Sequence, residues 1–142
     1  MSQSLTSSTS DNLALPETLC DLQATIAEAG PTATGILWRL AESGRQLDAN
    51  LVRLAPNEGV GRHAEPDLDV LLIVVAGAGT MASDVGELAL SEGAVTWMPR
   101  HSARSIAAGA EGLAYVTVHR RRPGMQIRSR PDHLPPPPPP HR

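Results

Sequence analysis

Three side chains that can bind metals or anions recur at odd-numbered positions near the middle of the chain. His63, Glu65 and Asp69 lie just before an apolar run at residues 70–76. In an extended chain, side chains two residues apart share a face, so these three are predicted to point the same way. The odd-numbered members of the apolar run continue this parity and are predicted to face the core: Leu71, Ile73 and Val75. Polar groups at one end of an apolar face predict a pocket in the mouth of a barrel or sandwich.

The residues that follow could complete such a pocket. Arg104 shares parity with the apolar Ile106, so it is predicted to reach into the same mouth. A buried arginine needs a carboxylate partner, which Glu65 or Asp69 would supply. His101 is interpreted first as a turn residue at the rim and second as a ligand-binding residue. The expected apolar walls are Leu71, Ile73 and Trp97.

Short strands separated by turns are predicted from Gly35 onward. Apolar residues recur there with a period of two, and Gly, Ser, Asp or Pro residues punctuate them at short intervals, with a turn predicted at Gly77–Gly79 and a loop at Gly109–Gly112. About eight such strands predict an all-β sandwich or barrel. A helix is expected before them, at about residues 16–29, because Leu19, Leu22 and Ile26 form one stripe and Gly30 ends it. It would pack outside the barrel or, alternatively, form a dimer contact.

The last predicted strand, residues 113–119, carries one apolar face and one mixed face. The apolar face consists of Ala114, Val116 and Val118. His119 shares the other face with Tyr115 and Thr117, and we expect that face to point outward. The three arginines that follow, at 120–122, are interpreted as a solvated strand end rather than as a binding patch.

The segment from 57 to 106 resembles the two motifs of the cupin superfamily. The string from His63 to Asp69, ending at Gly77, is similar to the first motif, G-x5-H-x-H-x3,4-E-x6-G. Gly93 and Pro99 match the second motif, G-x5-P-x-G-x2-H-x3-N, in which His101 and Arg104 replace the expected Gly and His. The resemblance implies a cupin-like β-barrel or jelly roll of short antiparallel strands, with the single helix on its N-terminal side.

The resemblance also implies where a metal would be bound. Position by position, the family's ligands correspond to His63, Glu65, Asp69 and Arg104, of which only the first is the family's own residue. Arginine cannot ligate, because guanidinium stays protonated and offers no lone pair. We therefore expect a metal-free binding or sensor domain for a small polar or anionic ligand, with no cofactor. The corresponding site residues are His63, Glu65, Asp69, Trp97, His101 and Arg104.

Two other functions remain open at this point. One is a metal-dependent cupin enzyme of the dioxygenase or isomerase type, in which His63, Glu65 and Asp69 bind Fe, Mn, Ni or Zn. The other is a scaffold whose working part is the run of six prolines at 135–140, because polyproline can enter a partner's aromatic groove. Whether the chain is an enzyme stays open.

Length and composition limit the organisation and the partners. The 142 residues are interpreted as a disordered tail at 1–12, one cupin-like domain at 13–123 with its barrel at about 35–120, and a Pro-rich tail at 124–142. The net charge of -3 gives no indication of nucleic-acid binding. No basic signal region or membrane-length apolar run is evident, so a cytoplasmic protein is expected. The single Cys20 excludes an internal disulfide, and only the family resemblance suggests a homodimer.

Overall fold

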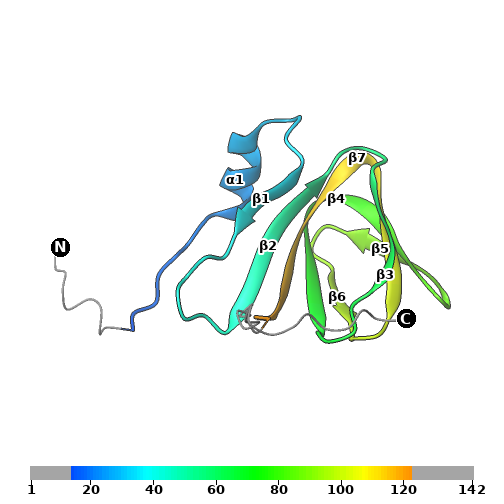
Figure 1. Ribbon diagram of the computed structural model, residues 1–142. Coiled ribbons are helices and arrows are strands. Elements are labelled where there is room, and N and C mark those ends of the chain that lie inside the picture. The colour runs from blue at the N-terminus through cyan, green and yellow to red at the C-terminus, as the bar shows by residue number, and fades with distance from the viewer. Residues whose placement is uncertain (1–13, 123–142) are drawn as a thin grey trace, which may run out of the picture.

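The computed structural model describes residues 14–122, which form one helix and seven strands (Figure 1). In chain order these are α1 (Leu22–Ala29), β1 (Gly35–Arg39), β2 (Leu47–Leu54), β3 (Gly59–Ala64), β4 (Val70–Ser83), β5 (Gly86–Ser91), β6 (Val95–Met98) and β7 (Ala103–Arg120). All the strand pairings are antiparallel. The predicted all-β architecture with one N-terminal helix is confirmed. The two predicted tails lie outside the described residues.

Two long strands organise the sheet. The strand order is β1-β2-β7-β4-β5, with β3 paired to β7 and β6 paired to β4. β4 and β7 pair from Val70 opposite His119 to Ser83 opposite Arg104. One half of each long strand pairs with β2 or β6, and the other half with β3 or β5. Figure 1 shows the resulting sheet curled on itself, so that one face becomes an interior.

Glycines bend the long strands without interrupting them. The sequence predicted a turn at Gly77–Gly79 and a loop at Gly109–Gly112, and both predictions are wrong, because β4 and β7 continue through these positions. Gly77 has a positive φ of 77°, and a Cβ there would collide with the carbonyl oxygen of Gly112. The ladder also shifts register between Val74 and Ala76. Only glycine allows this close approach and this backbone conformation, which together bend the sheet.

The inner face of the curled sheet holds the core. Its buried cluster consists of Leu54, Leu68, Val70, Leu72, Val74, Met81, Leu90, Met98, Ile106, Ala108, Leu113 and Tyr115. The inward-facing core positions of β4 are therefore Val70, Leu72 and Val74 in its first half and Met81 in its second half, and the prediction that Leu71, Ile73 and Val75 face this core is wrong. Leu71 is 37% exposed, whereas its neighbour Leu72 is fully buried. The prediction failed because the outer face of β4 is also apolar, so hydrophobicity alone did not distinguish the two faces.

The helix begins later than predicted. The side chain of Asp21 accepts a hydrogen bond of 3.0 Å from the backbone N–H of Ala24, so it caps a helix that starts at Leu22 rather than near residue 16. Residues 14–20 form an extended arm, which Figure 1 shows running away from the sheet. The expected position of the helix outside the barrel is confirmed, since Gln23 Nε2 donates 3.4 Å to the carbonyl oxygen of Val75. Within residues 14–122, no helix has the length and hydropathy needed to cross a membrane.

Candidate functional site

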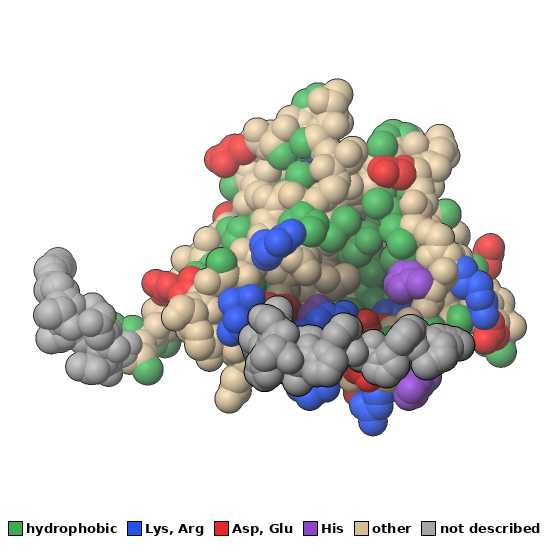
Figure 2. Space-filling model, viewed as in Figure 1, with side chains coloured by type: hydrophobic (Ala, Val, Ile, Leu, Met, Phe, Trp, Pro, Cys, Tyr) green, Lys and Arg blue, Asp and Glu red, His purple; other side chains and the backbone are tan. Residues whose placement is uncertain are grey.

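The curled sheet encloses a cavity of about 280 Å³, here called the inner cavity. Its floor is apolar and its polar groups lie toward one end. The lining residues are Val52, Val60, His63, Glu65, Val70, Leu72, Met98, Arg104, Ile106, Tyr115, Thr117, His119 and Arg122. Figure 2 shows the corresponding hollow, with hydrophobic side chains inside it and basic side chains at its margin. An apolar cavity with a few polar groups at one end is the usual form of a small-molecule site.

Strand pairing places His63 beside Arg104. The two residues are direct cross-strand partners in β3 and β7, so their side chains leave the sheet on the same face. His63 is exposed, and its Nδ1 lies 3.1 Å from the carbonyl oxygen of Gly61. The sequence correctly predicted that His63, Glu65 and Arg104 would lie together in the mouth.

Arg104 is a buried cation, with only 5% of the residue exposed. Its Nη1 donates to the carbonyl oxygen of Ser102 at 3.1 Å and to the Ser102 hydroxyl at 3.4 Å. Among residues 14–122, no carboxylate comes within ion-pair distance of it, so the predicted pairing with Glu65 or Asp69 is wrong. Burial lowers the pKa of this guanidinium, while the charge of Glu65 opposes that effect. Since arginine remains protonated in proteins, a positive charge is held inside the cavity.

Arg122, immediately after β7, takes the role that had been predicted for Arg104. Its Nη2 donates to Glu65 Oε1 at 2.7 Å, and the other carboxylate oxygen accepts 2.9 Å from the backbone N–H of Asp67. The Arg122 hydrogen bond, the Asp67 hydrogen bond and the nearby charges lower the pKa of Glu65 to about 2. Glu65 is therefore a carboxylate with a fixed partner, and the ion pair closes part of the mouth. Arg122 is exposed, as expected of a solvated strand end, but this ion pair also fixes its guanidinium at the cavity.

Asp69 and Trp97 do not line the inner cavity. The Asp69 carboxylate accepts the backbone N–H of Arg100 at 2.9 Å and pairs with its guanidinium at 3.2 Å. The chain bends at Pro66 and Asp67, so the two-residue alternation that had placed Asp69 beside Glu65 does not hold there. Trp97 lies opposite Leu71 on the outer face and is 57% exposed. Leu71 and Ile73, expected as walls with it, are also absent from the cavity lining.

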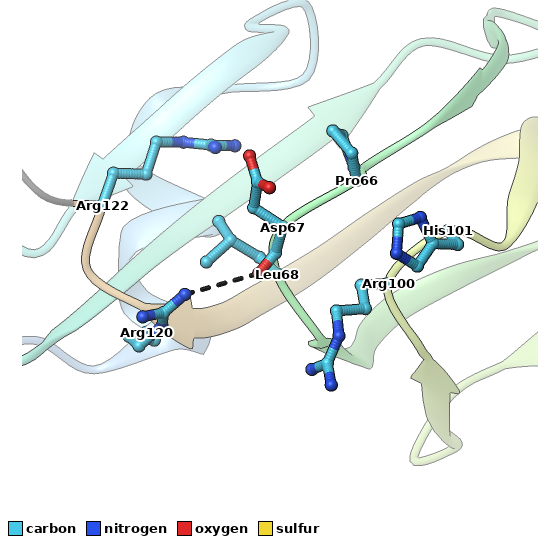
Figure 3. A pocket seen from close by; sticks show the side chains of 7 residues that line it. All are labelled: Pro66, Asp67, Leu68, Arg100, His101, Arg120 and Arg122. Carbon is cyan, nitrogen blue, oxygen red and sulfur yellow. Dashed lines mark hydrogen bonds between the residues drawn. The ribbon is translucent and has the colours of Figure 1, made fainter.

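His101 lines a second hollow, here called the rim pocket, of about 580 Å³ (Figure 3). The lining residues are Pro66, Asp67, Leu68, Arg100, His101, Arg120 and Arg122. His101 has φ of 75°, as expected of a residue at a tight turn, and its backbone N–H donates 2.7 Å to the carbonyl oxygen of Glu65. Arg100 pairs with Asp69 and Arg122 with Glu65, so carboxylates balance most of the positive charge here.

Sequence reasoning missed three cavity residues on β7. Tyr115, Thr117 and His119 all line the inner cavity, so the prediction that His119 faces outward is wrong. Burial raises the pKa of the Tyr115 hydroxyl. These three positions alternate along one strand and all carry hydrogen-bonding groups, a signal that could have identified them. The apolar positions between them were assigned to the core because the outer face of β7 is apolar as well.

The positions of the side chains bear on the alternative in which His63, Glu65 and Asp69 bind a metal. Within residues 14–122, no three His, Cys, Asp or Glu side chains are arranged to hold a metal ion. His63 and Glu65 share the inner cavity, but Asp69 is paired with Arg100 outside it. Arg104 stands where the resemblance places a fourth ligand, and it repels cations. The described residues therefore do not fit the metal that the fold family implies.

Comparison with known proteins shows the fold. No family model matches the sequence, and no curated protein does. Solved structures do match, including a Thermus thermophilus protein, TT1209, at a TM-score of 0.61 and 18% identity, covering 74% of this chain and 98% of that one. A cupin-2 domain protein from Shewanella frigidimarina matches at a TM-score of 0.58 and 16% identity, over 72% and 95% of the two chains. KdgF from Halomonas sp. matches at 0.54 and 20% identity, over 61% and 77%.

Proposed function

We propose that this cupin-fold domain binds a small anionic ligand in the inner cavity through Arg104, without a metal. One observation carries the proposal: Arg104, a residue only 5% exposed, lines the cavity and has no carboxylate within ion-pair distance among the described residues. Removing a charge from water is costly unless an opposite charge compensates it. An anionic ligand would provide that charge, and it would gain strong charge-assisted hydrogen bonds in return.

The rest of the cavity defines the ligand class. At about 280 Å³ the cavity lies near the lower end of the range for small-molecule sites. Thr117 and His119 offer hydrogen-bonding groups on the side of β7, and His63 offers another beside Arg104. Glu65 and Arg122, paired with each other, also line the cavity, and most of the remaining wall is apolar, supplied mainly by Val52, Leu72 and Met98. A small carboxylate with a hydrocarbon chain fits this arrangement. Its carboxylate group would bind Arg104, and its hydrocarbon chain would pack against the apolar walls.

The ion pair of Glu65 favours this proposal over a metal-dependent enzyme. A metal would need Glu65 as a ligand, but this carboxylate is already bonded to Arg122 and to the Asp67 N–H. Ligation would have to replace both hydrogen bonds beside the positive charge of Arg104. The proposed role is therefore ligand binding, as in a sensor or regulatory module.

The test is a thermal-shift series with carboxylates from acetate to octanoate, each beside the amide of the same length. A ligand at ten times its Kd stabilises the folded state by about 1.4 kcal/mol, which raises the Tm by several degrees. We expect a carboxylate to raise the Tm, the matching amide to have little effect, and Arg104→Gln to abolish the shift.

The matched control is Arg62→Gln. Arg62 is an exposed arginine that pairs with Asp84 at 2.8 Å and does not line the inner cavity. Its loss should leave the carboxylate shift unchanged. Equal shifts with carboxylate and amide, or a carboxylate shift that survives Arg104→Gln, would refute the proposal.

A further inference from the structure

The inner cavity is also lined by a buried hydroxyl, that of Tyr115, to which the proposed function assigns no role. The residue is only 5% exposed. Among residues 14–122, its hydroxyl has no hydrogen-bond partner. Its cross-strand partners are Val52 in β2 and Val74 in β4, so neither neighbour across the sheet offers a hydrogen-bonding group. A buried hydroxyl without a partner destabilises a fold, and a ligand oxygen would remove that penalty.

Tyr115 lies far from the mouth of the cavity. The ion pair of Arg122, which follows β7, closes part of that mouth. Along the cavity face of β7, Tyr115 comes four residues before His119, and four residues of extended strand span about 13 Å. Arg104 lies at the mouth, beside its cross-strand partner His63. A ligand whose carboxylate is bound at Arg104 therefore directs its other end toward Tyr115.

The electrostatics around Tyr115 define the group that this hydroxyl can bind. Burial and the nearby negative charge of Glu58 raise the pKa of the hydroxyl, so it keeps its proton at neutral pH and can donate a hydrogen bond. The charge of Glu58 and the apolar neighbours Val52 and Val74 would both disfavour a second carboxylate there. The group that fits is an uncharged oxygen that accepts a hydrogen bond.

We propose that the ligand is a small oxo acid, whose oxo group lies at a distance from its carboxylate and accepts a hydrogen bond from the Tyr115 hydroxyl. This inference rests on the proposed function, because Arg104 binds the carboxylate end of the same molecule. Tyr115 then determines which acids bind well. A buried donor that is left without an acceptor selects against an acid whose chain is only hydrocarbon.

The test measures Kd by calorimetry for pentanoate, hexanoate and heptanoate, and for the same acids with an oxo group on the carbon before the terminal methyl. We expect Tyr115→Phe to weaken binding of the best oxo acid at least about fivefold relative to its unsubstituted analogue, since the phenyl ring fills the same space without a donor. The control is Thr80→Val, which removes an exposed hydroxyl outside the cavity lining and should leave this ratio unchanged.

A second measurement uses the wild type alone. Tyr115 is the only tyrosine of the chain, so protein labelled with carbon-13 at tyrosine Cζ gives a single resonance, which reports on its hydroxyl. Saturation with the oxo acid should shift this resonance by more than saturation with the unsubstituted acid does. Equal shifts would refute a hydrogen bond between the ligand and Tyr115, whether or not Tyr115→Phe folds.

The outcomes separate this inference from the proposed function. If unsubstituted acids bind through Arg104 but Tyr115→Phe weakens both kinds of acid equally, the role of Tyr115 is refuted and the anion site stands. If neither kind of acid binds the wild type, both proposals are refuted. A selective loss of the oxo acid in Tyr115→Phe supports both.

Discussion

Arg104 places a positive charge inside the sheet, and no carboxylate of the described residues lies within ion-pair distance of it. Within residues 14–122, its hydrogen bonds both run from Nη1 to Ser102, so Nε and Nη2 have no hydrogen-bond partner there. Such a residue costs the fold stability, and the proposed anionic ligand would offset that cost. The stability of the unliganded protein should show that cost.

Replacing Arg104 with an apolar side chain of similar length should therefore stabilise the protein when no ligand is present. We expect Arg104→Met to raise the free energy of unfolding by roughly 1 kcal/mol or more, measured by urea denaturation in dialysed protein. The same change at the exposed Arg62 should stay within about 0.5 kcal/mol. A clear loss of stability in Arg104→Met would instead make this arginine a structural residue.

The ion pair between Glu65 and Arg122 should make stability depend on pH. The folded-state pKa of Glu65 is lowered from 4.5 to about 2, so its contribution is fully present above about pH 4.5 and is lost as the pH falls toward 2. Arg122→Gln should destabilise the protein at pH 7, and the difference from wild type should shrink through that window. Urea denaturation at several pH values measures it.

Arg121 provides the matched control for that experiment. It is the exposed neighbour of Arg122, and its backbone N–H, which a substitution would retain, donates 2.8 Å to the carbonyl oxygen of Gln46. Arg121→Gln should match the wild type at every pH. A difference between Arg122→Gln and wild type that stays constant from pH 7 to 2.5 would mean that Glu65 titrates normally.

The residue scale also shows what the sequence could predict about the site. The sequence predicted that three residues lie close together, and the structure places all of them in the lining of the inner cavity: His63, Glu65 and Arg104. Strand parity and motif position both pointed to these residues. The partner of Arg104 was predicted wrongly, since only the path of the chain beyond β7 brings Arg122 to Glu65. Glu65 and Arg122 are 57 residues apart in the sequence, and no local sequence pattern predicts a contact between them.

Among the elements, β4 and β7 determine the shape of the site by bending. At Gly77 a Cβ would collide with the carbonyl oxygen of Gly112 in β7, and the φ of 77° is unfavourable for any residue with a Cβ. We expect Gly77→Ala to lower the free energy of unfolding by more than about 2 kcal/mol, through strain and collision with Gly112. Chemical denaturation measures the loss.

Gly61 in β3 is the comparison glycine. A Cβ there would meet nothing within 4 Å, and its φ is not positive. Gly61→Ala should change the free energy of unfolding by less than about 1 kcal/mol. Equal effects at Gly61 and Gly77 would show that the strands do not need glycine at the bend.

The sequence predicted most strands but not their continuity or their inward faces. Turn-forming glycines at 77–79 and 109–112 suggested chain reversals, whereas the structure uses them to bend two unbroken strands. The inward faces of the first half of β4 and of the last half of β7 were assigned to the wrong parity, whereas Arg104 and Ile106 in the first half of β7 were assigned correctly. That error has one physical cause, since both faces of the sheet are apolar, and it led to the exclusion of His119 from the site.

At the scale of the whole molecule, the curled sheet separates two apolar faces. The inner face builds a core and a cavity lined by the buried Arg104, whereas the outer face carries Trp97, which is 57% exposed. Substitutions on the outer face should therefore leave the proposed ligand binding in the inner cavity unchanged.

The most direct test of the central claim is a four-way binding measurement by calorimetry. The Kd values of the best carboxylate and of its amide are measured for the wild type and for Arg104→Gln. If the guanidinium binds the carboxylate, the wild type should prefer the carboxylate by at least about tenfold, because a buried charge-assisted pair contributes more than 1.4 kcal/mol, and Arg104→Gln should lose that preference. A preference that is the same in both proteins would contradict the assignment of Arg104 as the anion-binding group.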